Sequence, residues 1–85
     1  MKMSDNNKKY ILYVKTSCPF CVEAEKLLSD KKEQCIVVPF DDQLEALEHM
    51  KWAYSHETVP MIFEKDENNI LFIGGYTDLL EYFNE

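Results

Sequence analysis

Apolar runs of strand length alternate with amphipathic stretches, and the pattern predicts the first elements of an α/β fold. Tyr10–Val14 and Gln34–Phe40 are rich in β-branched and aromatic residues, which is typical of strands, and the first is predicted to be a buried central strand. Between them, Pro19–Lys31 carries apolar residues on one stripe, as an amphipathic helix does. Pro39 puts the end of the second strand near a sheet edge. Strand, helix and strand in succession indicate a parallel crossover.

A second helix is predicted to follow and to run to about Tyr54. Asp41 and Asp42 offer an N-cap, and Asp42 with Glu45 three residues later resembles a capping box. The pattern breaks before Thr58–Val59–Pro60. The side chains that we expect this helix to bury are Leu44, Leu47, Met50 or the stem of Lys51, and Tyr54, with Trp52 in or near the core.

The last part of the chain predicts a hairpin and a short helix. Met61–Phe63 and Ile70–Ile73 are strand-like and flank the polar turn Lys65–Asn69. Gly74–Gly75 then precedes a helix over Leu79–Phe83. The predicted order of elements is βαβαββα.

Length and composition are those of one globular domain. The chain has 85 residues, of which 46% are hydrophobic and 13% aromatic, and this suffices for a single core. We expect residues 1–85 to form one domain, with Met1–Lys8 as a flexible tail. The polar segment Met1–Lys9 lacks the apolar centre of a signal peptide, so we expect a cytoplasmic protein.

Charge and hydropathy exclude two classes of partner. The net charge is −7 and the sequence contains no arginine, which argues against nucleic-acid and anionic-membrane surfaces. No apolar run approaches the length of about 18 residues that a membrane span needs. We therefore expect neither nucleic acid nor membrane as a partner.

Two cysteines three positions apart, Cys18 and Cys21, lie where the first strand gives way to the first helix. Pro19 has a fixed φ and no N–H, so it suits the first helical position and makes Cys18 the N-cap. The free amides of Phe20 and Cys21 then point at the Cys18 sulfur, and with the helix dipole they stabilise a thiolate. Lys15 adds a nearby cation. Cys21 is less exposed and suited to attack a mixed disulfide at Cys18.

A C-x-x-C pair is typical of either a redox site or a metal site. A structural zinc site takes four ligands, and only Cys35, His49 and His56 remain to complete one, at no recognised spacing. We therefore expect no metal site. Cys35, inside an apolar strand, is expected in the core, and the two histidines on the surface without partners.

The only two glycines, Gly74 and Gly75, are adjacent. Glycine is favoured where φ is positive or where a ligand comes close to the backbone. Thr77 and Asp78 are good helix starters, and a helix N-terminus there would receive a carboxylate through bare N–H groups. A tight turn between strand and helix is the alternative.

Three motifs resemble, in order and spacing, those of the dithiol glutaredoxins of the thioredoxin-fold superfamily, and the similarity extends from about Lys9 to Phe83. They are Cys18–Pro19–Phe20–Cys21, Thr58–Val59–Pro60 and Gly74–Gly75–Tyr76–Thr77–Asp78. The resemblance implies a thioredoxin-like fold with a four-stranded mixed sheet flanked by helices. It also implies a cis peptide bond before Pro60, which would face the cysteines.

The resemblance further implies a glutathione-dependent thiol–disulfide oxidoreductase that reduces protein disulfides and glutathione mixed disulfides. Cys18 would be the nucleophile and Cys21 the resolving thiol. Glutathione would be a co-substrate with no tightly bound cofactor, the partners would be disulfide-bonded or glutathionylated proteins, and the chain would be a monomer. The residues implied to bind glutathione are Lys15, Phe20, Thr58, Val59, Pro60, Gly75, Tyr76, Thr77 and Asp78.

Several positions depart from the family pattern. Phe20 replaces a commoner tyrosine and keeps the aromatic wall, whereas Tyr76 replaces a smaller residue and should narrow the groove. Ser55–His56–Glu57 replaces a lead-in that contains glycine and arginine. The second helix lacks the usual glutamine or arginine, which leaves Lys51 as a candidate ligand for the glycine carboxylate of glutathione.

Three alternatives stay open at this stage. A thioredoxin-like electron donor would be reduced by a flavoprotein and not by glutathione. An iron–sulfur module would share a cluster between two chains through Cys18 and glutathione, and would be coloured after reconstitution. An inert relative of the fold would lack an activated thiol.

Overall fold

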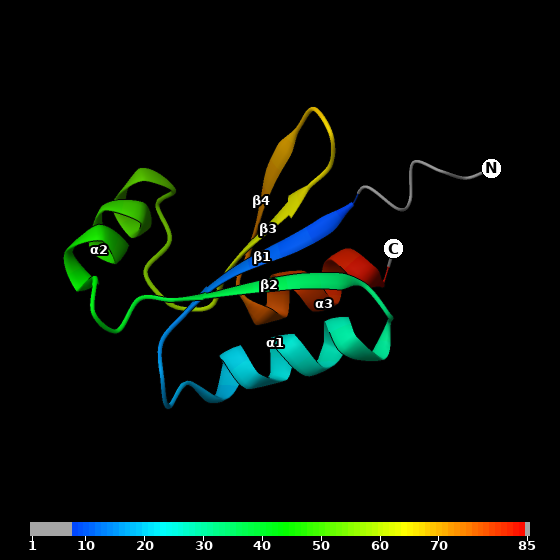
Figure 1. The fold of residues 1–85 in the computed structure, drawn as a ribbon, viewed down its shortest axis with the longest axis horizontal. Coiled ribbons are helices and arrows are strands. Elements are labelled where there is room, and N and C mark those ends of the chain that lie inside the picture. Colours follow the sequence, from blue (N-terminus) through cyan, green and yellow to red (C-terminus); the bar gives the residue numbers. More distant parts are fainter. Residues whose placement is uncertain (1–7, 85) are drawn as a thin grey trace.

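The computed structural model describes residues 8–84, and within them the chain forms the predicted sequence of elements, βαβαββα (Figure 1). The predicted tail lies outside the described residues except for Lys8. The helices and strands are β1 (Lys9–Val14), α1 (Pro19–Asp30), β2 (Gln34–Pro39), α2 (Leu44–Ala53), β3 (Met61–Lys65), β4 (Ile70–Gly74) and α3 (Tyr76–Phe83).

Residues 8–84 build one mixed four-stranded sheet with the order β2-β1-β3-β4. β1 pairs with β2 in parallel and with β3 antiparallel, and β3 pairs with β4 antiparallel, so the predicted crossover and hairpin are both confirmed. β2 is an edge strand, as Pro39 indicated. None of the helices in this part of the chain is long and apolar enough to cross a membrane.

One face of the sheet carries the larger core. Side chains alternate along a strand, so Tyr10, Leu12 and Val14 all point to the same face. α1 and α3 lie side by side on that face (Figure 1). The buried side chains of this core are Tyr10, Leu12, Val14, Cys21, Ala24, Leu28, Ile62 and Leu79, and half-buried Cys35 packs against it.

The opposite face is only partly covered, because α2 lies beside the strand ends and not across the sheet (Figure 1). Leu47 is the buried residue of α2, and Ile11 and Tyr13 of β1 remain half-buried. Three expectations for α2 are therefore wrong. Trp52 is 83%, Leu44 51% and Tyr54 40% exposed. The strand β1 is central, as predicted, but fully buried on one face only.

The predicted capping box of α2 is also wrong. Gln43 is the N-cap and makes no side-chain hydrogen bond to the helix. The Asp41 carboxylate instead accepts hydrogen bonds from the backbone N–H (2.9 Å) and the hydroxyl (2.8 Å) of Thr16. A tertiary partner has therefore replaced the local one.

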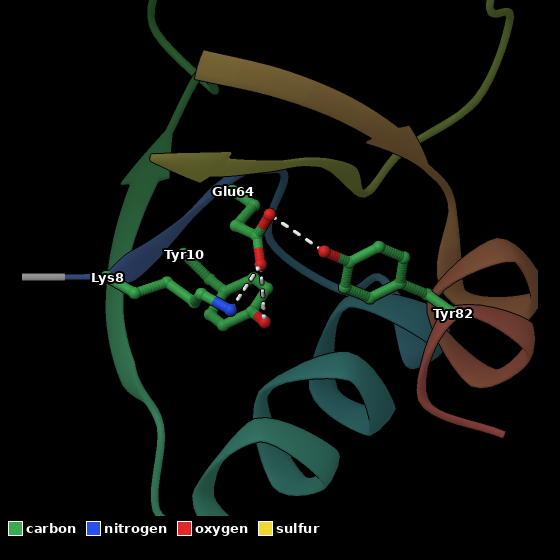
Figure 2. Close-up of polar contacts among 4 residues, drawn as sticks. All are labelled: Lys8, Tyr10, Glu64 and Tyr82. Carbon is green, nitrogen blue, oxygen red and sulfur yellow. Dashed lines mark hydrogen bonds and ion pairs between the residues drawn. The ribbon is translucent and has the colours of Figure 1, made fainter. Parts of the chain in front are cut away.

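Glu64 of β3 ties the sheet to α3 through a cluster of polar contacts (Figure 2). Its carboxylate accepts hydrogen bonds from the hydroxyls of Tyr82 (2.7 Å) and Tyr10 (3.1 Å), and Lys8 lies 3.2 Å away. Burial by itself would raise the pKa of Glu64, but these hydrogen bonds and the Lys8 charge outweigh it and lower the pKa. Burial and the bond to Glu64 raise the pKa of Tyr82 to about 12.

This cluster predicts an acid-sensitive contribution to stability. Because the folded-state pKa of Glu64 lies below the ordinary value of 4.5, its contribution is present above that value and is lost as the pH falls through the folded pKa. We expect Glu64→Gln to lower the free energy of unfolding at about pH 7 and to have a much smaller effect at about pH 3. Urea unfolding at both pH values measures this difference, and an equal effect at both would contradict it.

Candidate active site

The Cys18 sulfur is held at the start of α1 as the sequence predicts. Cys18 is the N-cap, with extended φ and ψ of −113° and 102°, and Pro19 occupies the first turn. The backbone N–H of Cys21 donates a hydrogen bond to the Cys18 sulfur over 3.2 Å. Cys18 is half-buried, so its sulfur combines an amide donor with access from solvent. This is the geometry that a thiolate nucleophile requires.

Cys21 differs from Cys18 in burial. Cys21 is only 3% exposed, and it lies on the face of α1 that packs in the core. Burial, followed by the interaction with Cys18, raises the pKa of the Cys21 thiol to about 12. Cys21 is therefore a protonated thiol in the reduced protein, which suits a group that acts only after Cys18 has reacted.

The loop before Cys18 is anchored by a residue that sequence analysis assigned to another role. Asp41 binds both the backbone and the hydroxyl of Thr16, and Ser17 adopts a left-handed φ of 62°. These hydrogen bonds, opposed by slight desolvation and aided by Lys15, lower the pKa of Asp41. Asp41 thus positions the loop that leads to Cys18. Nothing in the local sequence indicated a contact that spans 25 residues.

A groove with a volume of about 200 Å³ gathers most of the residues implied to bind glutathione. The peptide bond between Val59 and Pro60 is cis, as the resemblance implied. The rings of Phe20 and Tyr76 stack with centroids 6.0 Å apart, and both residues line the groove. The residues that line the groove are Phe20, His56, Thr58, Val59, Pro60, Gly75, Tyr76, Thr77 and Asp78.

Lys15 lies apart from this groove. Together with Cys18 and Cys21 it lines a second hollow of about 470 Å³. The Cys18 sulfur lies 3.7 Å from the carbonyl oxygen of Val59, so Cys18 contacts the groove as well. The predicted site residues therefore divide between two hollows, and the contact of Cys18 with Val59 links one to the other. Lys51 lines neither of them and pairs with Glu48 at 3.4 Å.

The N-terminus of α3 lines the groove. Gly75 is the N-cap, and its N–H donates a 2.8 Å hydrogen bond to the carboxylate of Asp78, so the helix starts at Tyr76 and not at Leu79 as predicted. The first-turn amides of an α-helix have no acceptor within the helix, so they are available to a ligand bound at that turn. Three of the groove residues, Tyr76, Thr77 and Asp78, belong to this turn.

His56 is the groove residue that sequence analysis missed. We expected a surface side chain without a partner, but its Nε2 lies 3.3 Å from the Thr58 hydroxyl and its ring meets Phe72 edge-on at 5.4 Å. A Cβ on Gly75 would lie 3.5 Å from the His56 ring. Its position two residues before Thr58–Val59–Pro60 was the available signal, because neighbours of a groove segment often line the groove.

The amino-acid sequence is similar to those of known glutaredoxins. The family model described as Glutaredoxin matches residues 10–68. Glutaredoxin 3 of Escherichia coli K12 is 35% identical over 68 residues, which cover 80% of this chain and 77% of that protein. A glutaredoxin-like protein of Encephalitozoon cuniculi is 34% identical over 56 residues, or 66% of this chain, and the match spans only 42% of that longer protein.

Solved structures are similar over nearly the whole chain. The dithiolic glutaredoxin 2-C-Grx1 of Trypanosoma brucei brucei superposes with a TM-score of 0.69 at 35% identity, over 96% of this chain and 82% of that one. Glutaredoxin 1 of Francisella tularensis, crystallised with cacodylate, gives 0.68 at 26% identity, over 92% and 99%. With its cysteine pair at the start of α1 and its mixed thioredoxin-like sheet, this chain belongs to the glutaredoxins, a family of thiol–disulfide oxidoreductases.

Proposed function

We propose that this protein reduces glutathione mixed disulfides and protein disulfides with electrons from glutathione. The observation that carries the proposal is the groove that runs from the Val59 carbonyl beside Cys18 to the first turn of α3. Its lining includes the N-terminus of α3, and a helix N-terminus attracts a carboxylate. The same proposal assigns the protein to the cytoplasm, where glutathione keeps thiols reduced.

Glutathione fits this site by charge at both of its ends. Its glycine carboxylate would face Lys15. Its γ-glutamyl end carries both a carboxylate and an ammonium: the carboxylate would meet the backbone amides and the hydroxyl at Thr77 and Asp78, and the ammonium would face the Asp78 carboxylate. The backbone of Val59 would pair with the cysteine residue of glutathione, which brings the glutathione sulfur next to Cys18. Phe20 and Tyr76 would enclose the chain between these ends.

The reaction on a glutathione mixed disulfide takes two exchanges. The Cys18 thiolate attacks the glutathione sulfur, the S–S bond of the substrate breaks, and the substrate leaves as a thiolate that takes a proton from water. A second glutathione thiolate then attacks the glutathione sulfur on Cys18. Oxidised glutathione leaves, and the Cys18 thiolate is restored under the Cys21 amide.

A protein disulfide requires Cys21. Attack by Cys18 on one substrate sulfur leaves a mixed disulfide and releases the other sulfur as a thiolate. Cys21 loses its proton to that thiolate or to water, attacks the Cys18 sulfur and expels the reduced substrate. Two glutathione molecules then reduce the Cys18–Cys21 bridge and leave as oxidised glutathione.

Reversal of the Lys15 charge tests the dependence on glutathione. We expect Lys15→Glu to raise the KM for glutathione by about tenfold, because an ion pair is replaced by a repulsion worth about 1.4 kcal/mol. Lys26→Glu is the matched control, since Lys26 is exposed on α1 outside both hollows. The measurement is glutathione-coupled turnover of a small mixed disulfide. A variant that keeps the parent KM, or a protein that thioredoxin reductase reduces and glutathione does not, would favour a thioredoxin-like donor.

A further inference from the structure

The single tryptophan of the chain, Trp52, lies on α2 with 83% of its surface exposed. Tryptophan is the largest apolar side chain and is highly buried on average, so an exposure of 83% is unusual for this residue type. It is also among the residues most enriched at the energetic centres of protein–protein interfaces. Because α2 covers the sheet only in part, Trp52 stays exposed and is available to a binding partner.

Trp52 lines two hollows, and one of them shares a residue with the groove. One, of about 480 Å³, is lined by Glu45, Glu48, His49 and Trp52. The other, of about 650 Å³, is lined by Glu48, Lys51, Trp52, Ser55, His56 and Glu57. His56 also lines the groove at Cys18. One side chain is thus shared between the surface around Trp52 and the groove that we assign to glutathione.

The end of α2 fixes His56 at this junction. Ser55 adopts a left-handed φ of 52°, and the N–H of His56 donates to the carbonyl of Lys51 over 2.9 Å, which is the closure of a Schellman motif. The chain therefore turns sharply after the helix. Thr58 and Phe72 then hold the His56 ring in place. The connection between the two surfaces is built into the fold and does not depend on a mobile side chain.

The charge around Trp52 is negative. Glu45, Glu48 and Glu57 line the two hollows, and the one lysine among the lining residues, Lys51, is paired with Glu48 at 3.4 Å. The whole chain carries a net charge of −7, so the long-range field has the same sign. A polypeptide that carries lysine or arginine next to an apolar side chain would bind this surface more tightly, because its charges would face the glutamates and its apolar side chain would pack on Trp52.

We propose that Trp52, Glu45, Glu48, His56 and Glu57 form a docking surface for the polypeptide around the reactive cysteine of a protein substrate. The segment bound has an apolar side chain that packs on Trp52 and basic residues that face the three glutamates. This inference rests on the proposed function, because the substrate cysteine must exchange with Cys18. The small groove takes the glutathione part of the substrate, and the docking surface takes the protein part.

The first test traps the complex. A Cys21→Ser/Cys35→Ser chain keeps Cys18 as its single cysteine. It is reacted with nine-residue peptides whose one cysteine is activated with thionitrobenzoate: Cys18 attacks the peptide sulfur and thionitrobenzoate leaves. The peptides are a leucine–lysine peptide, its leucine–glutamate counterpart and a glycine–serine peptide, with glutathione itself as a fourth adduct. The emission of Trp52 reports directly on the surface.

We expect the leucine–lysine adduct to shift Trp52 emission to shorter wavelength and to protect it from acrylamide, whereas the glutathione and leucine–glutamate adducts leave it unchanged. Failure of every peptide to react would refute the activity of Cys18 and with it the proposed function. Adducts that form while Trp52 emission stays the same would overturn the docking surface alone. Protection that depends on protein concentration without peptide, together with a dimer in light scattering, would assign the surface to a second copy of the chain and likewise overturn the proposal.

The second test is kinetic. For Trp52→Ala we expect the ratio of kcat/KM for the glutathionylated leucine–lysine peptide to that for a small glutathione mixed disulfide to fall about tenfold, which corresponds to a modest interface hot spot. Leu44→Ala is the matched control, because Leu44 is 51% exposed on the same helix and lines neither hollow. An unchanged ratio in Trp52→Ala, or an equal fall in both variants, would overturn the docking surface.

Discussion

Replacement of Cys18 by serine is expected to abolish turnover of a small glutathione mixed disulfide, with a loss of at least about a thousandfold, as for other catalytic nucleophiles. Serine keeps the N-cap hydrogen bond to the Cys21 amide but cannot form a disulfide. Cys21→Ser is expected to retain most of this turnover, because the exchange with a second glutathione needs only Cys18. Coupled oxidation of NADPH by glutathione reductase measures both.

The third cysteine provides the control for this pair. Cys35 is half-buried on β2, and burial raises the pKa of its thiol, so Cys35→Ser should leave turnover within about twofold of the parent. Equal loss in Cys18→Ser and Cys21→Ser would indicate a dithiol route of the thioredoxin type. Activity that survives in Cys18→Ser would refute Cys18 as the nucleophile.

Gly74→Ala is expected to lower the free energy of unfolding by about 2 kcal/mol or more, because strain and a clash coincide there. Gly74 has a φ of 125°, which side chains rarely adopt, and an added Cβ would collide with the Asp78 carboxylate, lying 2.7 Å from its Cγ. That carboxylate caps α3 through the Gly75 N–H. For a domain of this size the melting temperature should fall by roughly 8–16 °C, measured by circular dichroism.

The neighbouring glycine is the matched control. Gly75 has an ordinary φ of −96°, and an added Cβ would meet nothing closer than the His56 ring at 3.5 Å. Gly75→Ala should therefore lower the free energy of unfolding by less than about 1 kcal/mol. Equal destabilisation by the two substitutions would show that the loss comes from glycine as such and not from the contact with Asp78.

The parts of the site that were predicted correctly depend on neighbours in the chain. Pro19 fixes the start of α1, and the amide that meets the Cys18 sulfur comes from Cys21, three residues away. Alternation within β1 likewise needs only the period of a strand. Such features are set by backbone sterics and adjacent hydrogen bonds, so sequence is enough to derive them.

The errors share a different cause. Asp41 had a local role available as the cap of α2 and took Thr16 instead. Trp52 was expected in or near the core, but its helix covers the sheet only in part and leaves the side chain exposed. His56 was expected on the surface although it lies two residues before Thr58, and the ring that packs against it is that of Phe72 on another strand. In each case the local sequence allowed two placements of the side chain, and a contact with a residue distant in sequence decided between them.

The sequence by itself determined the order of elements, the cysteine pair at the start of α1 and the family to which the chain belongs. Only the tertiary structure decided that Asp41 anchors the loop before Cys18, that His56 joins the groove and that Trp52 faces solvent beside it. The physical reason is the range of the interactions. Helix caps and strand periods act within a few residues, whereas the cover over a sheet depends on how whole elements pack against one another.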